Sequence, residues 1–279
     1  MLLKTFLFLV AVRSVNAECK CTPADDYWPS QSDWSSLNKT ENGKLIANQA
    51  ITTPCFQGAN YDAKTCDSIT ANWSSSWLLE SSPIGYSYPL IQTCTPSNPS
   101  LNLMCDLGSA PVFTINATNA SDVAAGIKFS KDNNVRLVIK STGHDVVGRS
   151  EGYGSLSILI KHTKDGIHFQ AQYNSSTKCK SNWTGSSLTV GGGYVWEDVY
   201  ANAAEHGTIA VGGSDRSVGV IGGYLQGGGH ASGTKPQNAL LELCLVGGGK
   251  VLDPAPLTSV NPDYKHDWYG DMYEWLSSV

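Results

Sequence analysis

The sequence is poor in charged residues and contains no run of basic ones. Only 15% of the 279 residues are charged, and 24 acidic against 19 basic side chains give a net charge of −5 at pH 7. Nucleic-acid-binding domains carry a basic face or stripe. This balance therefore argues against a nucleic-acid partner.

Long apolar runs are missing beyond the first residues. Residues 1–17 read MLLKTFLFLVAVRSVNA, with Lys4 near the start, a short apolar core, and a small-residue cleavage site ending at Ala17. This pattern is typical of a secretory signal peptide, and its apolar core is too short to span a bilayer. No later segment reaches spanning length. We therefore expect a secreted protein that does not engage a membrane.

Several common catalytic signatures are also absent. The nearest approach to Gly-x-Gly-x-x-Gly is GGGYVW at 191–196, where Trp196 stands in place of the third glycine. No Gly-x-Ser-x-Gly elbow is present. His144 and Asp145 could ligate a metal, but the other histidines show no spacing that completes such a site. The sequence therefore disfavours a nicotinamide enzyme, a serine hydrolase and a metal centre.

The cysteines support export. An even number of cysteines in an exported chain favours disulfides, although spacing does not reveal the pairing. For the pair Cys19-x-Cys21 a disulfide is favoured over a metal, because no further ligand cluster accompanies it. The eight cysteines are Cys19, Cys21, Cys55, Cys66, Cys94, Cys105, Cys179 and Cys244.

Six Asn-x-Ser/Thr sequons point to the same compartment, because this sequence accepts N-linked glycans in the secretory pathway. We therefore expect a glycoprotein. The sequon asparagines are Asn38, Asn72, Asn116, Asn119, Asn174 and Asn182.

Residues 18–106 are rich in Ser, Thr, Asn, Trp and Cys and show little sustained periodicity. We expect a loop-rich segment tied by disulfides, with short helices in YWPSQSDWSSLN and NWSSSWLLESSP. Its large aromatic side chains are expected to act as packing anchors. They are Trp28, Trp34, Trp73 and Trp77.

From residue 107 the spacing of apolar residues becomes regular and indicates strands and helices. APVFTIN, VRLVIK, SLSILI and SSLTVGG indicate strands, TIAV at 208–211 a short strand, and residues 239–253 a hairpin. SDVAAGIKFSKDNN indicates a helix with Ser121 as its N-cap, and VWEDVYANAAEHG a helix that ends at Gly207. A strand–helix–strand order predicts an α/β unit.

Glycine is concentrated in one region, since 17 of the 28 glycines lie between Gly185 and Gly249. Such density lets a ligand approach the backbone closely, and we favour a cofactor-binding segment over a flexible one. A second small-residue loop, KSTGHDVVGRS, follows the strand VRLVIK and surrounds His144. Successive backbone amides in such a loop suit a phosphate. A cofactor that stays attached, such as a flavin, would fit an exported protein.

Three segments carry a family resemblance. RLVIKSTGHDVVGRS, GYVWEDVYANAAEHG and GGSDRSVGVIGGYLQGGGH resemble, in this order, the PCMH-type FAD-binding domain of the vanillyl-alcohol-oxidase superfamily, and most closely its exported fungal berberine-bridge-enzyme-like oxidases. The resemblance implies an α+β fold in which a FAD-binding domain of two α/β subdomains covers 107–253. The segment 18–106 precedes it, and a divergent tail, 254–279, follows.

The resemblance also implies roles for individual residues, all of them toward FAD. His144 matches the histidine that bonds covalently to the flavin, and Asp215 stands where some relatives have a second, cysteine link. We therefore expect one covalent bond. The loop expected to hold the pyrophosphate comprises Ser141, Thr142, Gly143, His144, Asp145, Gly148, Arg149 and Ser150. The strand-turn expected beside the flavin comprises Ser217, Val218, Gly219, Val220, Ile221, Gly222 and Gly223, and the glycine turn after it Gly227, Gly228, Gly229 and His230.

What the resemblance implies about function is an oxidase. In the family the substrate, an alcohol, a sugar or a secondary metabolite, passes a hydride to the flavin, and dioxygen then takes the electrons. Relatives of this type are longer, and we expect their substrate domain to be missing here, so no residue is nominated as the catalytic base. The alternatives are a non-catalytic flavin-binding glycoprotein and a structural or carbohydrate-binding module.

Overall fold

A computed structural model describes residues 19–85, 94–96, 105–173, 185–227, 245–247 and 250–252. Its helices are α1 (Gln31–Thr40), η1 (Thr53–Cys55), α2 (Ala63–Ala71), α3 (Ser76–Ser81), α4 (Ala120–Asp132), α5 (Trp196–Glu205), η3 (Val220–Tyr224, a π-helical turn) and α6 (Leu225–Gly227). Its strands are β1 (Leu45–Ala47), β2 (Phe113–Asn116), β3 (Arg136–Lys140), β4 (Ser155–Leu159), β5 (Ile167–Gln170), β6 (Ser187–Val190), β7 (Leu245–Gly247) and β8 (Lys250–Leu252).

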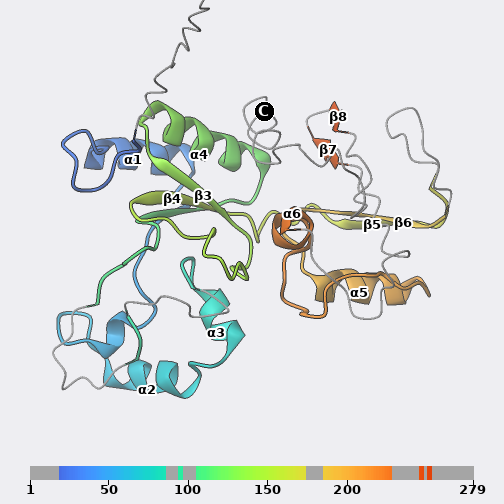
Figure 1. Ribbon diagram of the computed structural model, residues 1–279, viewed down its shortest axis with the longest axis horizontal. Helices are drawn as coiled ribbons and strands as arrows, with labels where there is room; N and C mark the ends of the chain where they lie inside the picture. Colours follow the sequence, from blue (N-terminus) through green and yellow to red (C-terminus); the bar gives the residue numbers. More distant parts are fainter. Residues whose placement is uncertain are drawn as a thin grey trace, which may run out of the picture.

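A four-stranded sheet of order β1-β2-β4-β3 forms the first half of the fold. β4 pairs in parallel with both β2 and β3, whereas β1 pairs antiparallel with β2. Figure 1 shows α1 and α4 side by side on one face of this sheet, with α2 and α3 on its other side. Because β3 and β4 are parallel neighbours, the loops that follow them leave the sheet at the same edge.

The core of this half lies between α4 and the sheet. Ile115 and Ile158 are fully buried there, and Val123 and Ile127 of α4, partly buried, pack against this core. Gly126 makes the close approach possible, because a Cβ at this position would lie 2.7 Å from the Cδ1 atom of Ile115. The helix therefore rests directly on the sheet that carries the loops after β3 and β4.

The N-terminal segment is anchored by aromatic packing and disulfides. The Trp34 ring stacks on Phe113 with centroids 4.2 Å apart, and Trp28 packs against the same core. Disulfides join Cys55 to Cys66 and Cys94 to Cys105, which confirms that cysteines of this segment are paired. Within the described residues Cys19 and Cys21 have no disulfide partner. Cys179 and Cys244 lie outside the described residues.

The second half of the fold is built on β5, β6 and α5 (Figure 1). The two strands pair antiparallel, and α5 buries Val199 and Ala203 on one face. Trp196 is the centre of this core, stacked on Tyr200 at 5.3 Å and edge-on to Tyr224 at 4.8 Å. Both halves mix helices and strands, as expected for this fold class. Of the hairpin expected within 239–253, β7 and β8 are described and pair antiparallel.

Three sequence predictions are wrong. The N-cap of α4 is Asn119, not Ser121, because the Asn119 side chain accepts the backbone N–H of Asp122. Residues 208–211 form no strand, and the Ile209 side chain there is 92% exposed. Trp77 is 58% exposed and does not anchor a buried core as expected. Alternation and aromatic content indicate only that a side chain is apolar, and tertiary contacts decide whether it is covered.

No helix in the described part of the chain is long and apolar enough to cross a membrane.

Glu41, the residue after the last turn of α1, has a buried carboxyl group without a hydrogen-bond partner among the described residues. Its side chain is 1% exposed. Burial, reinforced by the negative charge of Asp122, raises the pKa of Glu41 to about 7 even though Lys44 acts in the opposite direction. The protonated carboxyl is therefore favoured in the folded state.

We expect Glu41→Gln to stabilise the protein at pH 8 by about 1–2 kcal/mol, less than the full pKa shift implies because Lys44 and solvent partly screen the charge. Because the pKa of Glu41 is raised on folding, ionisation of its carboxyl lowers the stability of the wild type. This destabilisation is absent below about pH 4.5 and grows as pH rises toward 7. The difference in unfolding free energy between variant and wild type should therefore vanish at acidic pH. Denaturant unfolding at several pH values measures it, and a pH-independent difference would contradict the assignment.

Candidate functional site

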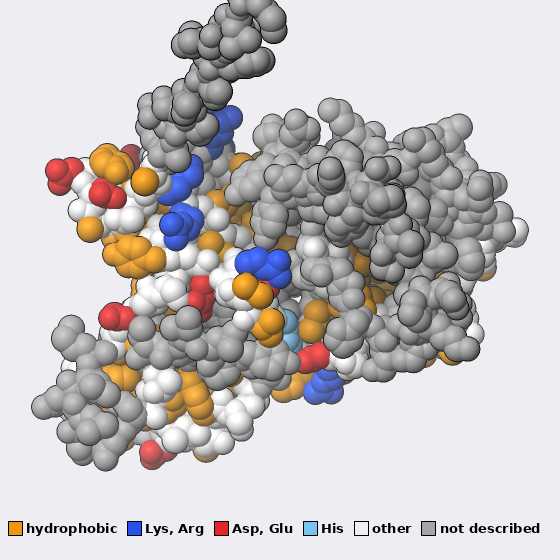
Figure 2. Space-filling model, in the orientation of Figure 1, with side chains coloured by type: hydrophobic (Ala, Val, Ile, Leu, Met, Phe, Trp, Pro, Cys, Tyr) orange, Lys and Arg blue, Asp and Glu red, His pale blue; other side chains and the backbone are white. Residues whose placement is uncertain are grey.

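The loop after β3 and the segment after α5 meet at one place, where His144 lies. Its side chain is 11% exposed, and its Nε2 atom lies 2.8 Å from the Oγ atom of Ser217 and 3.2 Å from the Oε1 atom of Glu80. Figure 2 shows pale blue histidine atoms near the middle of the drawn face, bordered by hydrophobic and basic side chains. Residues far apart in the sequence therefore converge on one imidazole.

Ser217 contacts three other polar residues of the site, His144, Glu80 and Asp215. Its hydroxyl lies 2.9 Å from Glu80 Oε1 and 3.0 Å from Asp215 Oδ1, and it has one proton to donate to either. Asp215 Oδ2 also lies 3.9 Å from the Nδ1 atom of His144. Partial burial acts to raise the pKa of Asp215, but the backbone and side-chain hydrogen bonds from Ser217, together with the nearby Arg216 charge, hold it below its ordinary value. The site therefore keeps a negative charge beside the imidazole.

The two expected cofactor segments pack directly on each other. The backbone N–H of Gly219 donates to Thr142 Oγ1 at 3.3 Å. A Cβ on Gly219 would lie 2.2 Å from Ser141 Oγ, and one on Gly222 would lie 2.8 Å from Ser141 Cβ. Glycine at these two positions is thus required by protein packing. The segment forms a single bridge, Val195 with Gly219, and then the π-helical turn η3 that contains Gly222 and Gly223.

The apolar residues of that segment face the second core, and Val220 is one of its buried members. Val218 and Ile221 pack, partly buried, against the cluster around Trp196. The segment is therefore fixed on one side by this core and on the other by the loop after β3.

The loop after β3 turns through two glycines with positive φ, Gly143 at 91° and Gly148 at 78°. Asp145 holds its second half, accepting from the Arg149 guanidinium at 2.6 Å and from the Arg149 backbone N–H. Partial burial acts to raise the pKa of Asp145, but Arg149 keeps it below the ordinary value. Ser150 follows at the end of the loop.

Part of the predicted site is not described. Gly227 is the last residue of α6, and its backbone follows directly from η3. Gly228, Gly229 and His230 lie outside the described residues.

The sequence predictions missed Glu80, which contacts His144, and the burial of Lys140 at the start of the same loop. Glu80 comes from α3, in a stretch, LLESSP, without any motif. Lys140 ends β3, where alternation predicts an outward-facing side chain, yet it is 2% exposed. Its Nζ atom donates to the carbonyl oxygens of Pro83, at 2.9 Å, and Gly85. Burial lowers the pKa of Lys140 to about 7.

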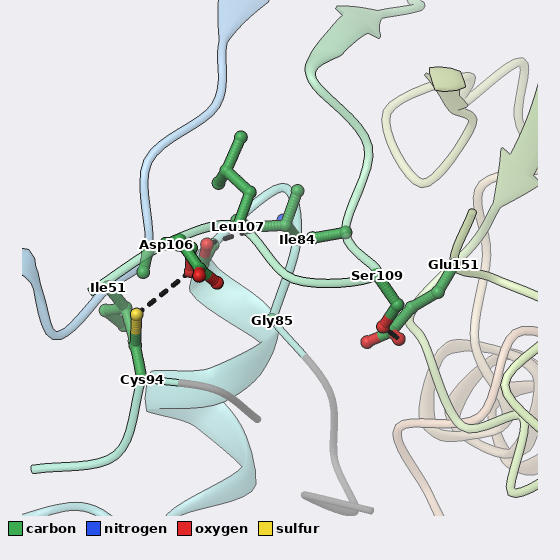
Figure 3. Close-up of a pocket in the computed structure, with 11 residues that line it drawn as sticks. Ile51, Ile84, Gly85, Cys94, Asp106, Leu107, Ser109 and Glu151 are labelled. Carbon is green, nitrogen blue, oxygen red and sulfur yellow. Dashed lines mark hydrogen bonds between the residues drawn. The ribbon is translucent and has the colours of Figure 1, made fainter. Parts of the chain in front are cut away.

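A small cavity lies elsewhere in the molecule, beside the Cys94–Cys105 disulfide. Figure 3 shows Ile51, Ile84 and Leu107 around it, with the Cys94 sulfur directed at the Asp106 carbonyl oxygen, 3.0 Å away. Its volume of about 40 Å³ suits a water molecule and not a nucleotide. Among the described residues no group of His, Cys, Asp and Glu could hold a metal ion.

The chain is similar to fungal flavoproteins. It is 43% identical over 219 residues to the FAD-linked oxidoreductase apf9 of Gibberella fujikuroi, covering 78% of this chain and 37% of that protein. It is 36% identical over 225 residues to the VAO-type flavoprotein oxidase VAO615 of Thermothelomyces thermophilus, covering 76% and 37%. The chain therefore spans little more than a third of the length of these relatives.

The fold gives the same result. The crystal structure of the VAO-type flavoprotein MtVAO713 from Myceliophthora thermophila C1 matches with a TM-score of 0.73 and 40% identity, covering 77% of this chain and 39% of that one. The family model described as FAD binding domain matches residues 111–252, half of the chain. Both the loop after β3 and the segment 217–223 lie inside this range. The chain belongs to the FAD binding domain family, among the VAO-type flavoproteins related to the berberine-bridge-enzyme oxidases, and its cofactor is FAD.

Proposed function

We propose that the protein is a secreted FAD-dependent oxidoreductase that holds its flavin through a covalent bond to His144. The observation that carries this proposal is the convergence of both expected cofactor segments on the His144 imidazole, with Ser217 Oγ 2.8 Å from Nε2. Within the described residues this is the place where a small-residue loop at a strand end meets a glycine-rich segment.

The residues at this place fit FAD. Ser141 Oγ is buried and has no hydrogen-bond partner within the described part of the chain. Most buried hydroxyl groups in proteins have such a partner, so a polar group of a bound ligand would satisfy this one. Around Gly148 and Gly223 there is open space, since a Cβ at either position would meet no atom within 4 Å. The loop supplies a polar cradle and the glycines supply room.

The chemistry follows from how these residues hold the cofactor. When bound, FAD supplies a ring that accepts a hydride from the substrate and passes two electrons to dioxygen. The backbone amides of the loop 141–150 suit the diphosphate, because oriented N–H groups bind anions. His144 would keep the cofactor in place outside the cell and, as an alkylated imidazole, would withdraw electron density from it. Asp215 stands at the position of a second link in some relatives and cannot form one.

The substrate class that we propose is an alcohol, a sugar or a secondary metabolite, with dioxygen as the electron acceptor. The apolar, cleavable pattern of residues 1–17 and the six sequons support secretion and glycosylation. A second candidate is a flavin-binding glycoprotein without turnover. It is favoured by the absence, among the described residues around His144, of a side chain that we can nominate as the catalytic base.

Flavin analysis tests the proposal. We expect the purified chain, expressed with ample riboflavin, to keep its yellow colour in the pellet after acid precipitation. Mass spectrometry of the peptide containing His144 should show the mass of the attached flavin. A colourless pellet together with an unmodified peptide would contradict the covalent bond.

Turnover distinguishes the two candidates. Hydrogen peroxide produced from a panel of alcohols and sugars by the yellow protein supports the oxidase. A yellow pellet without peroxide from any of these substrates supports the non-catalytic flavoprotein.

A further inference from the structure

Glu80 reaches the imidazole from a part of the chain that the family match does not include. It lies on α3, in the N-terminal segment, whereas the family model covers residues 111–252. Its side chain is 8% exposed, and its Oε1 atom lies 3.2 Å from His144 Nε2 and 2.9 Å from Ser217 Oγ. Burying a carboxylate charge costs free energy unless the charge is paired or hydrogen-bonded, so the contacts of Glu80 with His144 and Ser217 are needed to offset its burial.

Three contacts hold α3 and the residues after it against the site. Lys161, just after β4, donates from Nζ to the Glu80 carbonyl oxygen at 2.7 Å. Lys140, at the end of β3, donates to the carbonyl oxygens of Pro83 and Gly85. The Arg216 guanidinium lies 5.2 Å from the centroid of the Trp77 ring. Glu80 is therefore placed by the same strands that place His144.

The atoms around His144 also decide its tautomer. An ionised carboxylate only accepts hydrogen bonds, so the nitrogen facing Glu80 must carry a proton. That nitrogen is Nε2. Its N–H can donate a hydrogen bond to Ser217 Oγ, and the Ser217 hydroxyl can in turn donate one to Glu80 Oε1. In the neutral imidazole Nδ1 then carries the lone pair. The nearest carboxylate oxygen of Asp215 is 3.9 Å from Nδ1, beyond hydrogen-bond distance.

We infer that Glu80 is a positioning residue for His144, which fixes the Nε2–H tautomer and directs Nδ1 to bond with the flavin. This inference rests on the proposed covalent attachment. It assigns to the N-terminal segment a direct part in cofactor attachment, in addition to its packing on the sheet.

The attachment step balances with dioxygen as the oxidant. The new bond joins Nδ1 to the 8-methyl carbon of the flavin and replaces one C–H bond. One proton leaves the methyl carbon and one leaves the imidazole through Nε2, where Ser217 and Glu80 receive it. The two electrons reduce the flavin ring and then dioxygen, which with the two protons becomes hydrogen peroxide. Glu80 stabilises the positive charge that builds on the ring when Nδ1 becomes alkylated.

A time course of attachment tests the inference. The chain, prepared without flavin from riboflavin-limited cells, is mixed with FAD, and acid-precipitable flavin is measured against time. We expect Glu80→Gln, which keeps the shape and removes the charge, to slow attachment at least tenfold. Because Glu80 acts on the imidazole and not on the FAD molecule, the dissociation constant for non-covalent FAD should change less than twofold. Glu80→Asp should recover part of the rate.

The controls separate positioning from structure. Glu205→Gln removes an exposed carboxylate of α5 and should attach flavin at the wild-type rate. A Glu80→Gln protein that attaches flavin as fast as wild type would overturn the inference. A Glu80→Gln protein that loses FAD affinity and thermal stability in proportion to the rate would overturn it as well, since a purely structural role predicts that pattern. If wild type itself forms no bond, the proposed covalent link fails, and the inference with it.

Discussion

His144→Ala is expected to convert all covalently bound flavin into flavin that acid releases. The substitution removes the imidazole that we propose as the nucleophile where the loop after β3 meets the segment 217–223, so the proposed bond to the flavin cannot form. Acid-precipitable flavin should fall from near-stoichiometric to none, while non-covalent FAD binding is weakened but retained. Absorbance and fluorescence of the pellet and the supernatant measure the distribution.

The matched control for this prediction is His168→Ala. His168 lies on β5 with its side chain exposed, so its removal should leave flavin in the pellet. Retention of pellet flavin in His144→Ala would show that another residue forms the link. Loss of pellet flavin in His168→Ala as well would show that the assay reports general instability.

Gly222→Ala is expected to destabilise the protein, whereas Gly223→Ala should not. A Cβ on Gly222 would lie 2.8 Å from both Ser141 Cβ and Ile160 Cδ1, so the segment 217–223 would have to move away from the loop after β3. Overpacking of this kind costs about 1–3 kcal/mol. A Cβ on Gly223, the next residue in the same turn, would meet no atom within 4 Å.

Thermal unfolding of both variants without flavin measures the difference. For a chain of this size we expect the Tm of Gly222→Ala to fall by about 2–4 °C per kcal/mol, with Gly223→Ala close to wild type. Because the space around Gly223 is where we expect the flavin, Gly223→Ala should weaken FAD binding without this loss of stability. Equal melting temperatures for the two variants would contradict the packing that we describe.

The sequence predicts most of the first half of the fold from local patterns. The apolar alternation of VRLVIK and SLSILI gives β3 and β4, and the pattern of SDVAAGIKFSKDNN gives α4, whose Val123 and Ile127 pack partly buried on the core. It misses β1, a three-residue strand whose partner β2 is distant in the chain, and β5, a four-residue strand that pairs with β6. It also places a strand at 208–211, where no neighbour in the described structure pairs with it.

The candidate site is divided in the same way. The loop around His144 is visible in the sequence because small residues after a strand are a local signal. The role that we assign to Glu80 has no local signal, since an isolated Glu in LLESSP resembles any surface residue. The burial of Lys140 is likewise set by the carbonyl groups of residues 83 and 85, more than fifty positions away. Its position in the strand alone predicts the opposite.

By itself, then, the order of residues determined strands β2, β3, β4 and β6, helices α4 and α5, the glycine-rich segments and the small-residue loop that carries the histidine. These depend on backbone geometry and on periodicities within a few residues. Only the tertiary structure decided which polar side chains surround that histidine and which glycines are required by packing, because such contacts join parts of the chain that share no local pattern. Glu80 and His144 are 64 positions apart in the sequence, yet in the folded chain their side chains are within 3.2 Å.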